Sequence, residues 1–526
     1  MRIAALLPAV LLAAAPARVQ HQPMKTIGMY VHQHWPYHHP YAARTWTVDD
    51  WRAYAGGLKA LGFNTIMIWP VLETMPEPLS PSDRASLEKH RQVIDMLHRM
   101  GMRAWIALCP NVSAKNQEAA RAPFHQRHFF YCDRRVDPAD PAALQDFMRW
   151  REKLLQPLGK ADAVAVIDSD PGGYPGSTNA QFVHLLAEHR RMLDRIRPGI
   201  ELIYWMHAGW EAYGRYYQSG RLVLGDDAEH LDCLRRLKEL NPEPWGVANG
   251  LQYAQQLGFP ERVVSFNYGR IEGEPSFPVT NFGGTTAHEG GRSLAPRGVM
   301  GNAQTHCVQL PNTFAFARGA QNLPCTDADY LRFADDLIPG QGRLILEAWK
   351  RLAGADSEAM RSAAALLERA ARQNPSGGPL KGLLFNDPSR FLVDLVHMLR
   401  YRAALEDLVR AHAAATRDGE RAAEGSSPPN PMAAAARAFL QAAESWQKRH
   451  GYKNMWWEPR IHPALRSLNH PGLNAVLDIT YDVKAAPLAA GNAYEQVARN
   501  LADIETYTPR LLAALREALR ESHANR

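Results

Sequence analysis

The stretch Asp162-Ala-Val-Ala-Val-Ile-Asp-Ser-Asp-Pro-Gly-Gly-Tyr174 sets the fold expected of this chain. Its apolar run from Ala163 to Ile167 is typical of a strand that is buried on both faces of a parallel sheet. Asp168 and Asp170 end the run, and the Pro-Gly-Gly that follows predicts a turn. Parallel α/β sheets place their chemistry at the carboxyl ends of their strands, so these aspartates are the candidate catalytic residues. The alternative is that one aspartate caps the following helix while the other bonds loop amides.

Short apolar runs alternate with amphipathic stretches on both sides of this segment. The expected strands are 26–31, 64–69, 103–108, 163–167, 201–206, 245–249, 262–266 and 298–302. The expected helices between them are 48–61, 82–100, 142–158, 179–196 and 228–240. Repeated strand–helix units of this length predict an α/β fold, a (β/α)8 TIM barrel. An open doubly wound sheet is the alternative, but it would call for a glycine-rich phosphate fingerprint after the first strand, which is absent.

After Cys325 the strand signals stop and the apolar spacing becomes helical. The expected helices there are 330–352, 358–372, 390–415, 433–449 and 493–519, with a loop at 425–431. We therefore predict a (β/α)8 barrel over residues 25–325, followed by an all-helical C-terminal domain over residues 326–526. The helical domain either packs on the barrel or offers a surface for a homo-oligomer.

The N-terminal residues are typical of an export signal. Met1-Arg2 is a short basic start, residues 3–12 are apolar, and Ala13 to Ala17 offers small residues for cleavage. We predict a signal peptide over residues 1–20 and an exported protein, periplasmic or secreted. No later stretch is long enough to predict a membrane span.

Composition limits the class of partner. The chain has 526 residues, 46% of them hydrophobic and 22% charged, which is typical of a globular protein. Its net charge of +6 arises from basic residues interleaved with acids, so a nucleic-acid partner is not expected. Five cysteines without paired spacing do not predict a zinc site or a disulfide framework, and no cofactor is expected.

Polar and aromatic residues follow most of the expected strands, where they would converge on one end of the barrel. The candidate substrate-binding residues are His32, His34, Trp69, Glu73, Tyr204, Trp205, His207, Trp210, Asn267, Tyr268, Gln304 and His306. Aromatic rings can stack on the apolar faces of a pyranose, while amides and imidazoles bond its hydroxyls. A phosphate site would instead show glycine-rich loops and clustered Arg or Lys. The mixture predicts a carbohydrate substrate.

Together, an export signal, a barrel, acids that close the fourth strand and a tryptophan-rich end resemble retaining glycoside hydrolases. The resemblance is to the hexosaminidase-type barrels of families 18, 20 and 84, which have their acidic motif at this strand. It covers residues 25–322 and is architectural. Family 20 shows Gly-Asp-Glu there and family 84 shows adjacent aspartates, whereas this chain has Asp168-Ser169-Asp170. The resemblance therefore implies glycosidic hydrolysis without implying an acetamido-assisted mechanism.

We expect a glycoside hydrolase that uses Asp168 and Asp170, with Glu73 and Glu211 as alternative acids. Glycosidic cleavage needs one carboxylic acid to protonate the leaving oxygen and a second group to stabilise or attack the anomeric carbon. One alternative is a metal-dependent hydrolase of the amidohydrolase type, because His32, His34 and His207 follow two strands. Another is a carbohydrate-binding barrel without catalytic activity.

Overall fold

The computed structural model describes residues 25–34, 38–114, 121–127, 134–168, 178–206, 227–272, 285–419, 431–451, 460–478 and 507–521. Eight parallel strands form a closed barrel in the order β1-β10-β9-β8-β7-β6-β3-β2. Their bounds are β1 (Thr26–Val31), β2 (Thr65–Ile68), β3 (Arg103–Leu108), β6 (Ala163–Ile167), β7 (Glu201–Trp205), β8 (Trp245–Ala248), β9 (Val263–Asn267) and β10 (Gly298–Ala303). Pairing of Thr26 with Gly298 through Val31 with Ala303 closes the barrel. The predicted (β/α)8 fold is confirmed.

Each predicted strand is present to within one or two residues. The reason is burial, because the barrel interior covers one face of each strand and the outer helices cover the other. All five residues of β6 are buried, as its unbroken apolar run predicts. The apolar run of the quoted segment, Ala163 to Ile167, therefore lies where the sequence places it, in the wall of the barrel.

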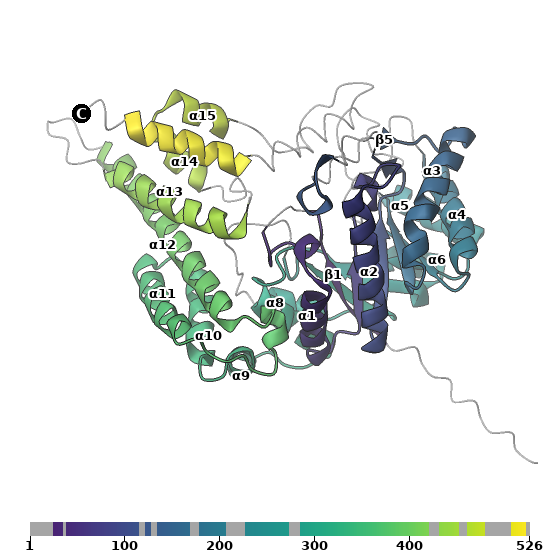
Figure 1. The fold of residues 1–526 in the computed structure, drawn as a ribbon, viewed down its shortest axis with the longest axis horizontal. Coiled ribbons are helices and arrows are strands. Elements are labelled where there is room, and N and C mark those ends of the chain that lie inside the picture. Colours follow the sequence, from purple (N-terminus) through teal and green to yellow (C-terminus); the bar gives the residue numbers. More distant parts are fainter. Residues whose placement is uncertain are drawn as a thin grey trace, which may run out of the picture.

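Helices follow the strands and surround the barrel (Figure 1). Their bounds are α1 (Val48–Ala60), α2 (Pro81–Arg99), α3 (Pro141–Leu155), α4 (Asn179–Ile196), α5 (Asp227–Leu240), α6 (Leu251–Leu257), α7 (Thr285–Gly291) and α8 (Leu310–Ala320). Capping boxes begin α1 with Thr47 and Asp50, and α2 with Ser80 and Asp83. In each box the hydroxyl and the carboxylate satisfy backbone amides that the first helical turn leaves unpaired. Local sequence thus fixes where these helices start.

Some short elements are absent from the sequence prediction. Helices α6 and α7 have only seven residues each, too few for a clear amphipathic repeat. The antiparallel pair β4 (Val112–Ser113) and β5 (Arg134–Arg135) has two residues per strand, and α8 is buried on nearly all sides. Tertiary contacts, and not local pattern, define these elements.

The rest of the described chain is helical. Its elements are α9 (Asp327–Leu337), α10 (Gly342–Leu352), α11 (Ser357–Arg372), η9 (Lys381–Leu384), α12 (Pro388–Gly419), α13 (Pro431–His450), α14 (Ile461–Arg466), α15 (Pro471–Leu477) and a helix at 507–521. The single helix predicted over 330–352 is wrong: it is α9 and α10, separated at Pro339-Gly340, where Gly340 has φ of 77°. Proline lacks the amide that continues a helix, and glycine adopts the left-handed turn. The domain boundary at residue 325 lies between α8 and α9 and stays a prediction.

The helical part lies against the barrel beside α1 and α8 (Figure 1). Phe385, after η9, stacks on Tyr54 of α1 with ring centroids 5.9 Å apart. Gly57 of α1 allows Leu383 to pack against the helix, because an added Cβ would overlap the Leu383 side chain. Tyr41, in the loop after β1, packs on Trp446 of α13 with centroids 5.7 Å apart. The helices therefore support the segment that leaves β1.

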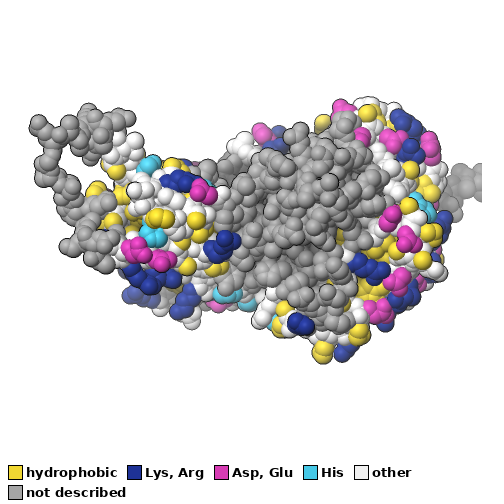
Figure 2. Space-filling view, turned by 90° about the horizontal axis from the view of Figure 1, so that it is seen from above, with side chains coloured by type: hydrophobic (Ala, Val, Ile, Leu, Met, Phe, Trp, Pro, Cys, Tyr) yellow, Lys and Arg dark blue, Asp and Glu magenta, His cyan; other side chains and the backbone are white. Residues whose placement is uncertain are grey.

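On the face shown in Figure 2, the basic side chains of the described residues lie among acidic ones. None of the described helices is both long and apolar enough to cross a bilayer. Cys109, Cys233, Cys307 and Cys325 are free thiols, while Cys132 lies outside the described residues. The predicted signal peptide also lies outside them and stays a prediction.

Barrel closure predicts a strong effect of adding one methyl group at Gly298. This residue has φ of 105°, and an added Cβ would overlap the Thr26 backbone, its ladder partner on β1. Gly101 is the matched control, because it has φ of 70° and its added Cβ would meet nothing within 4 Å. We expect Gly101→Ala to lower the free energy of unfolding by about 1 kcal/mol and Gly298→Ala by at least about 3 kcal/mol. Urea unfolding measures both, and equal losses would contradict the steric account.

Candidate active site at the carboxyl end of the barrel

The segment that leaves β1 directs every second side chain into the barrel. Tyr30, His32 and His34 are spaced two residues apart and contact one another in order, with ring centroids 5.7 Å and 4.1 Å apart. Between the histidines, Gln33 faces the other way and bonds His90 of α2 at 3.1 Å. This alternation is the period of an extended strand, and it continues past the last paired residue.

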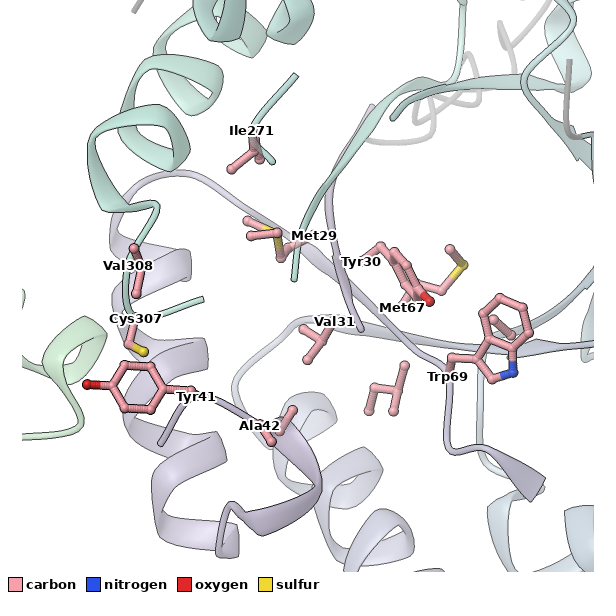
Figure 3. Packing of buried hydrophobic residues seen from close by; sticks show 14 of the residues in the cluster. Met29, Tyr30, Val31, Tyr41, Ala42, Met67, Trp69, Ile271, Cys307 and Val308 are labelled. Atoms are coloured by element: carbon pink, nitrogen blue, oxygen red, sulfur yellow. The ribbon is translucent and has the colours of Figure 1, made fainter. Parts of the chain in front are cut away.

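Aromatic rings from opposite sides of the barrel meet these side chains. Tyr30 lies 5.3 Å from Trp205 of β7 and 5.9 Å from Phe266 of β9, between ring centroids. Trp69, directly after β2, lies 4.4 Å from His34 and 5.7 Å from Trp205. Figure 3 shows Tyr30 and Trp69 on one side of β1 and Met29 and Val31 on the other. We call Tyr30, Trp69, Trp205 and Phe266 the aromatic floor of the site.

The two histidines beside the floor are neutral at neutral pH. Burial, and after it the nearby His306 and Arg44, lowers the pKa of His32 well below its usual value. Burial also lowers the pKa of His34, with smaller contributions from His32 and Arg44. The backbone N–H of His34 donates to Nδ1 of His32 at 3.3 Å, which requires that nitrogen to be unprotonated. The acceptor of His32 is therefore engaged within the chain and its proton is on Nε2, which makes this nitrogen a donor, while a neutral His34 ring has one donor and one acceptor.

Glu73 lies beside the floor, in η2 (Leu72–Thr74). Its carboxylate accepts the backbone N–H of Cys109 at 2.7 Å and the indole N–H of Trp69 at 3.3 Å. Burial raises the pKa of Glu73, although the charge of Arg151 and these hydrogen bonds oppose the increase. Glu73 is thus a buried acid that is hydrogen-bonded to one ring of the floor, Trp69.

Asp168 lies at the end of β6 but faces the outer helices. Tyr204 donates its hydroxyl to Asp168 Oδ2 at 2.8 Å, and the Tyr204 ring packs on Phe182 of α4 at 5.1 Å. The charge of Asp168 also contributes, after burial, to a raised pKa of the Cys233 thiol on α5. Because Trp205 faces the interior, its neighbour Tyr204 must face outward. Tyr204 therefore does not lie beside the floor as the sequence analysis expects, and the roles of Asp168 and Tyr204 stay predictions.

Three further candidates belong to β9 or follow β9 and β10. Asn267 donates its side-chain amide to the carbonyl of Gly290 on α7, so it faces outward from β9. Tyr268 is 48% exposed, and Gln304 is buried with its backbone N–H on Glu272 at 2.8 Å. Asn267 thus faces away from the floor, because its neighbour Phe266 faces the interior and side-chain direction alternates along a strand. The substrate-binding roles of Asn267, Tyr268 and Gln304 stay predictions.

His306 lies between β10 and α1. Its Nδ1 is 2.9 Å from the hydroxyl of Tyr54, and its ring packs on Trp46 at 5.4 Å. Burial lowers the pKa of His306 to about 3. It is near enough to influence His32 electrostatically, but its ring contacts belong to the junction with the helical part.

Asp170, His207, Trp210 and the alternative acid Glu211 lie outside the described residues, so their predicted roles are not tested. Within the described part of the chain, no group of three or more His, Cys, Asp or Glu is arranged to hold a metal ion. The metal-dependent alternative therefore stays a prediction, as does the expected absence of a cofactor.

The sequence analysis missed Tyr30, Phe266 and Glu272. Tyr30 precedes His32 by two residues, so strand periodicity could have found it. Glu272 follows β9 by five residues, and its buried carboxylate accepts the N–H groups of Gln304 and Thr305 at 2.8 Å and 2.6 Å. It also accepts the hydroxyl of Thr305 at 2.6 Å, and so fixes the segment after β10. No local pattern marks Glu272, because its donors come from another strand.

Neither a protein-family model nor a curated protein matches the chain. Among solved structures, CpGH84B is 8% identical over 81% of this chain and 74% of its own, with a TM-score of 0.40. A mutant of the Thermobaculum terrenum O-GlcNAc hydrolase is 11% identical over 91% and 94%, with a TM-score of 0.36. A family 20 exo-β-N-acetylglucosaminidase from Vibrio harveyi is 13% identical over 62% and 58%, with a TM-score of 0.36. Glycoside hydrolases of families 20 and 84, two of the three families named from the sequence, are thus among the similar structures. The likeness concerns the fold alone.

The buried histidines predict a loss of stability in acid. In the folded chain the pKa of His306 is about 3, against a usual value of 6.5, so the unfolded chain binds the proton first. The stabilisation is complete above about pH 6.5 and decreases as pH falls toward 3, by at most about 1.4 kcal/mol per pH unit for each such histidine. We expect His306→Gln to reduce this slope between about pH 6 and pH 4 in urea unfolding.

The exposed His125, in η4 (Phe124–Gln126), supplies the matched control. His125→Gln should leave the slope of the parent unchanged. An equal slope in the parent, His306→Gln and His125→Gln would mean that His306 takes up its proton in the folded protein as readily as in the unfolded chain.

Proposed function

We propose that this protein is an exported glycoside hydrolase that cleaves a glycosidic bond in a glycan or oligosaccharide. The observation that supports it is the aromatic floor with two neutral imidazoles at the carboxyl end of a closed barrel. Aromatic faces pack against the apolar C–H faces of a pyranose, and neutral histidines donate to and accept from its hydroxyls. His32, His34 and Trp205 are 9%, 6% and 5% exposed, which makes them the most accessible of the set and the first to meet a sugar.

Acid–base chemistry in this proposal comes from the end of β6. A general acid protonates the glycosidic oxygen as the bond to the anomeric carbon breaks, and a second group stabilises or attacks that carbon. Asp168 is held by Tyr204 on the outer side of the strand. We therefore assign the general acid to Asp170 and a positioning role to Asp168. Export rests on the N-terminal sequence alone, with its basic start and apolar run.

The acid assignment predicts a loss that depends on the leaving group. Asp170→Asn should lower kcat/KM for natural oligosaccharides by about two to four orders of magnitude, the usual scale for general acid–base catalysis. Dinitrophenolate leaves without being protonated, so on dinitrophenyl glycosides the same variant should show a smaller loss of kcat/KM. A screen of aryl glycosides and oligosaccharides with parent and variant measures both. Full activity of Asp170→Asn on a natural substrate would overturn the assignment, and sugar binding without turnover by the parent would indicate a binding protein.

The hydrogen bond between Tyr204 and Asp168 provides a second comparison. Asp168→Asn and Tyr204→Phe each disturb the same contact, so we expect similar losses in kcat/KM of about tenfold. Because the two residues act as a unit, the double variant should lose little more than either single variant. Independent, multiplying losses would show that the two residues act separately.

Glu73 is predicted to orient Trp69 and not to donate the catalytic proton. Glu73→Gln keeps an acceptor for one N–H but loses the charge, so KM should rise about three- to tenfold with kcat nearly unchanged. The exposed Glu77, which pairs with Arg149, is the control, and Glu77→Gln should change neither constant. A fall in kcat that good leaving groups rescue would identify Glu73 as the acid instead.

A further inference from the structure

Arg44 is a buried cation close to the candidate site. It belongs to η1 (Ala43–Thr45), in the segment between β1 and α1, and its side chain is only 2% exposed. Charged side chains are seldom buried to this extent unless their hydrogen-bonding groups are satisfied, because leaving water is costly. Burial, and after it the charge of Arg127, lowers the pKa of Arg44 to about 9, so the guanidinium is still charged at neutral pH.

Backbone carbonyls satisfy this guanidinium. Its Nη2 donates to the carbonyl of His34 at 2.7 Å, and its Nε donates to the carbonyl of Gln33. Its Nη1 donates to the carbonyls of Arg127 and, at 3.3 Å, of Phe124. Among the described residues no carboxylate forms an ion pair with Arg44, whereas the neighbouring Arg127 pairs with Asp83 at 2.7 Å. The planar guanidinium of Arg44 thus donates its hydrogen bonds to backbone carbonyls and holds the segments that contain them.

The two sets of carbonyls belong to segments with different supports. Gln33 and His34 lie in the segment that directs the histidines toward the floor. Phe124 and Arg127 lie in a segment anchored to α2, since Arg127 bonds Asp83 near the start of that helix. Helix α2 also holds Arg44 itself, because Lys89 donates to its carbonyl at 2.7 Å. Arg44 therefore links the exit of β1 to a rigid helix outside the barrel.

We propose that Arg44 is a positioning residue that holds His32 and His34 in place for substrate binding. The proposal depends on the proposed function for its kinetic consequence, but its structural part does not. Without the Arg44 guanidinium, the carbonyls of Gln33 and His34 lose their hydrogen bonds. The backbone is then free to move, and the two imidazoles no longer have a fixed orientation. Arg44 touches no substrate in this account, and its effect reaches the sugar through the histidines.

The kinetic test compares Arg44→Met and Arg44→Lys with the parent. Lysine keeps a charge, but its single ammonium cannot reach both segments with the geometry of a planar fork, so it should not rescue. We expect both variants to raise KM about tenfold or more, with kcat within about threefold of the parent. The control is Arg52→Met on the neighbouring α1, where Arg52 is exposed and pairs with Asp49 three residues earlier.

A second measurement needs no substrate. Nitrogen-15 NMR of the imidazoles in the full chain reports which ring nitrogen holds the proton. In the parent, His32 should show an unprotonated Nδ1, because this atom accepts the N–H of His34. In folded Arg44→Lys, and in Arg44→Met if it folds, the signal should move toward a mixture of tautomers, while Arg52→Met should match the parent.

The outcomes separate the two proposals. An altered His32 signal with a raised KM supports the positioning role. An altered signal in a protein whose parent neither cleaves nor binds sugars supports the positioning role and contradicts the proposed function. A parental His32 signal and KM in folded Arg44→Lys would overturn the positioning role, even if thermal unfolding shows that the variant is less stable.

Discussion

In a closed parallel barrel each side chain faces either the interior or the surrounding helices, and the choice alternates along the strand. The candidate site depends on this constraint. On β1 and the segment that leaves it, the interior positions hold Tyr30, His32 and His34, and Trp205 occupies an interior position on β7. The positions between them serve the helices: Gln33 bonds α2, and Tyr204 packs on α4. Pairing of β1 with β10 closes the ring and brings side chains from distant parts of the sequence together.

Burial then sets the chemistry of the interior. The imidazoles beside the floor are neutral because leaving water penalises their charged forms, and Arg44 adds to that effect. The same penalty raises the pKa of Glu73, which lies behind Trp69. The result is a set of rings and neutral imidazoles, each at most 9% exposed, at the carboxyl end of the barrel. The proposed uncharged, hydroxyl-rich ligand fits such a set better than a phosphate or a nucleic acid would.

The sequence predicted the strands well, because burial leaves a local pattern, but it predicted the site only in part. A strand buried on both faces needs an unbroken apolar run, and β6 shows such a run without any tertiary information. The direction of a residue beyond the strand depends on whether the extended backbone continues, which the sequence does not state. Tyr204 and Trp205 are adjacent, so only one of them could face the interior, and alternation alone could have separated them. Glu272 could not have been found, because the groups that hold it follow β10.

The central claim is that the aromatic floor binds a pyranose, and saturation-transfer-difference NMR tests it most directly. The parent and Trp205→Ala would be compared for binding to a panel of oligosaccharides that are not cleaved. The control is Trp245→Ala, since Trp245 lies on the outer side of β8 and packs on Phe259. The account predicts transfer to the C–H groups on one face of a single sugar ring in the parent and the control. It also predicts at least about tenfold weaker binding by Trp205→Ala, since removing a stacking aromatic costs about 1–3 kcal/mol. Equal binding by the parent and Trp205→Ala, or no binding of any sugar by the parent, would contradict it.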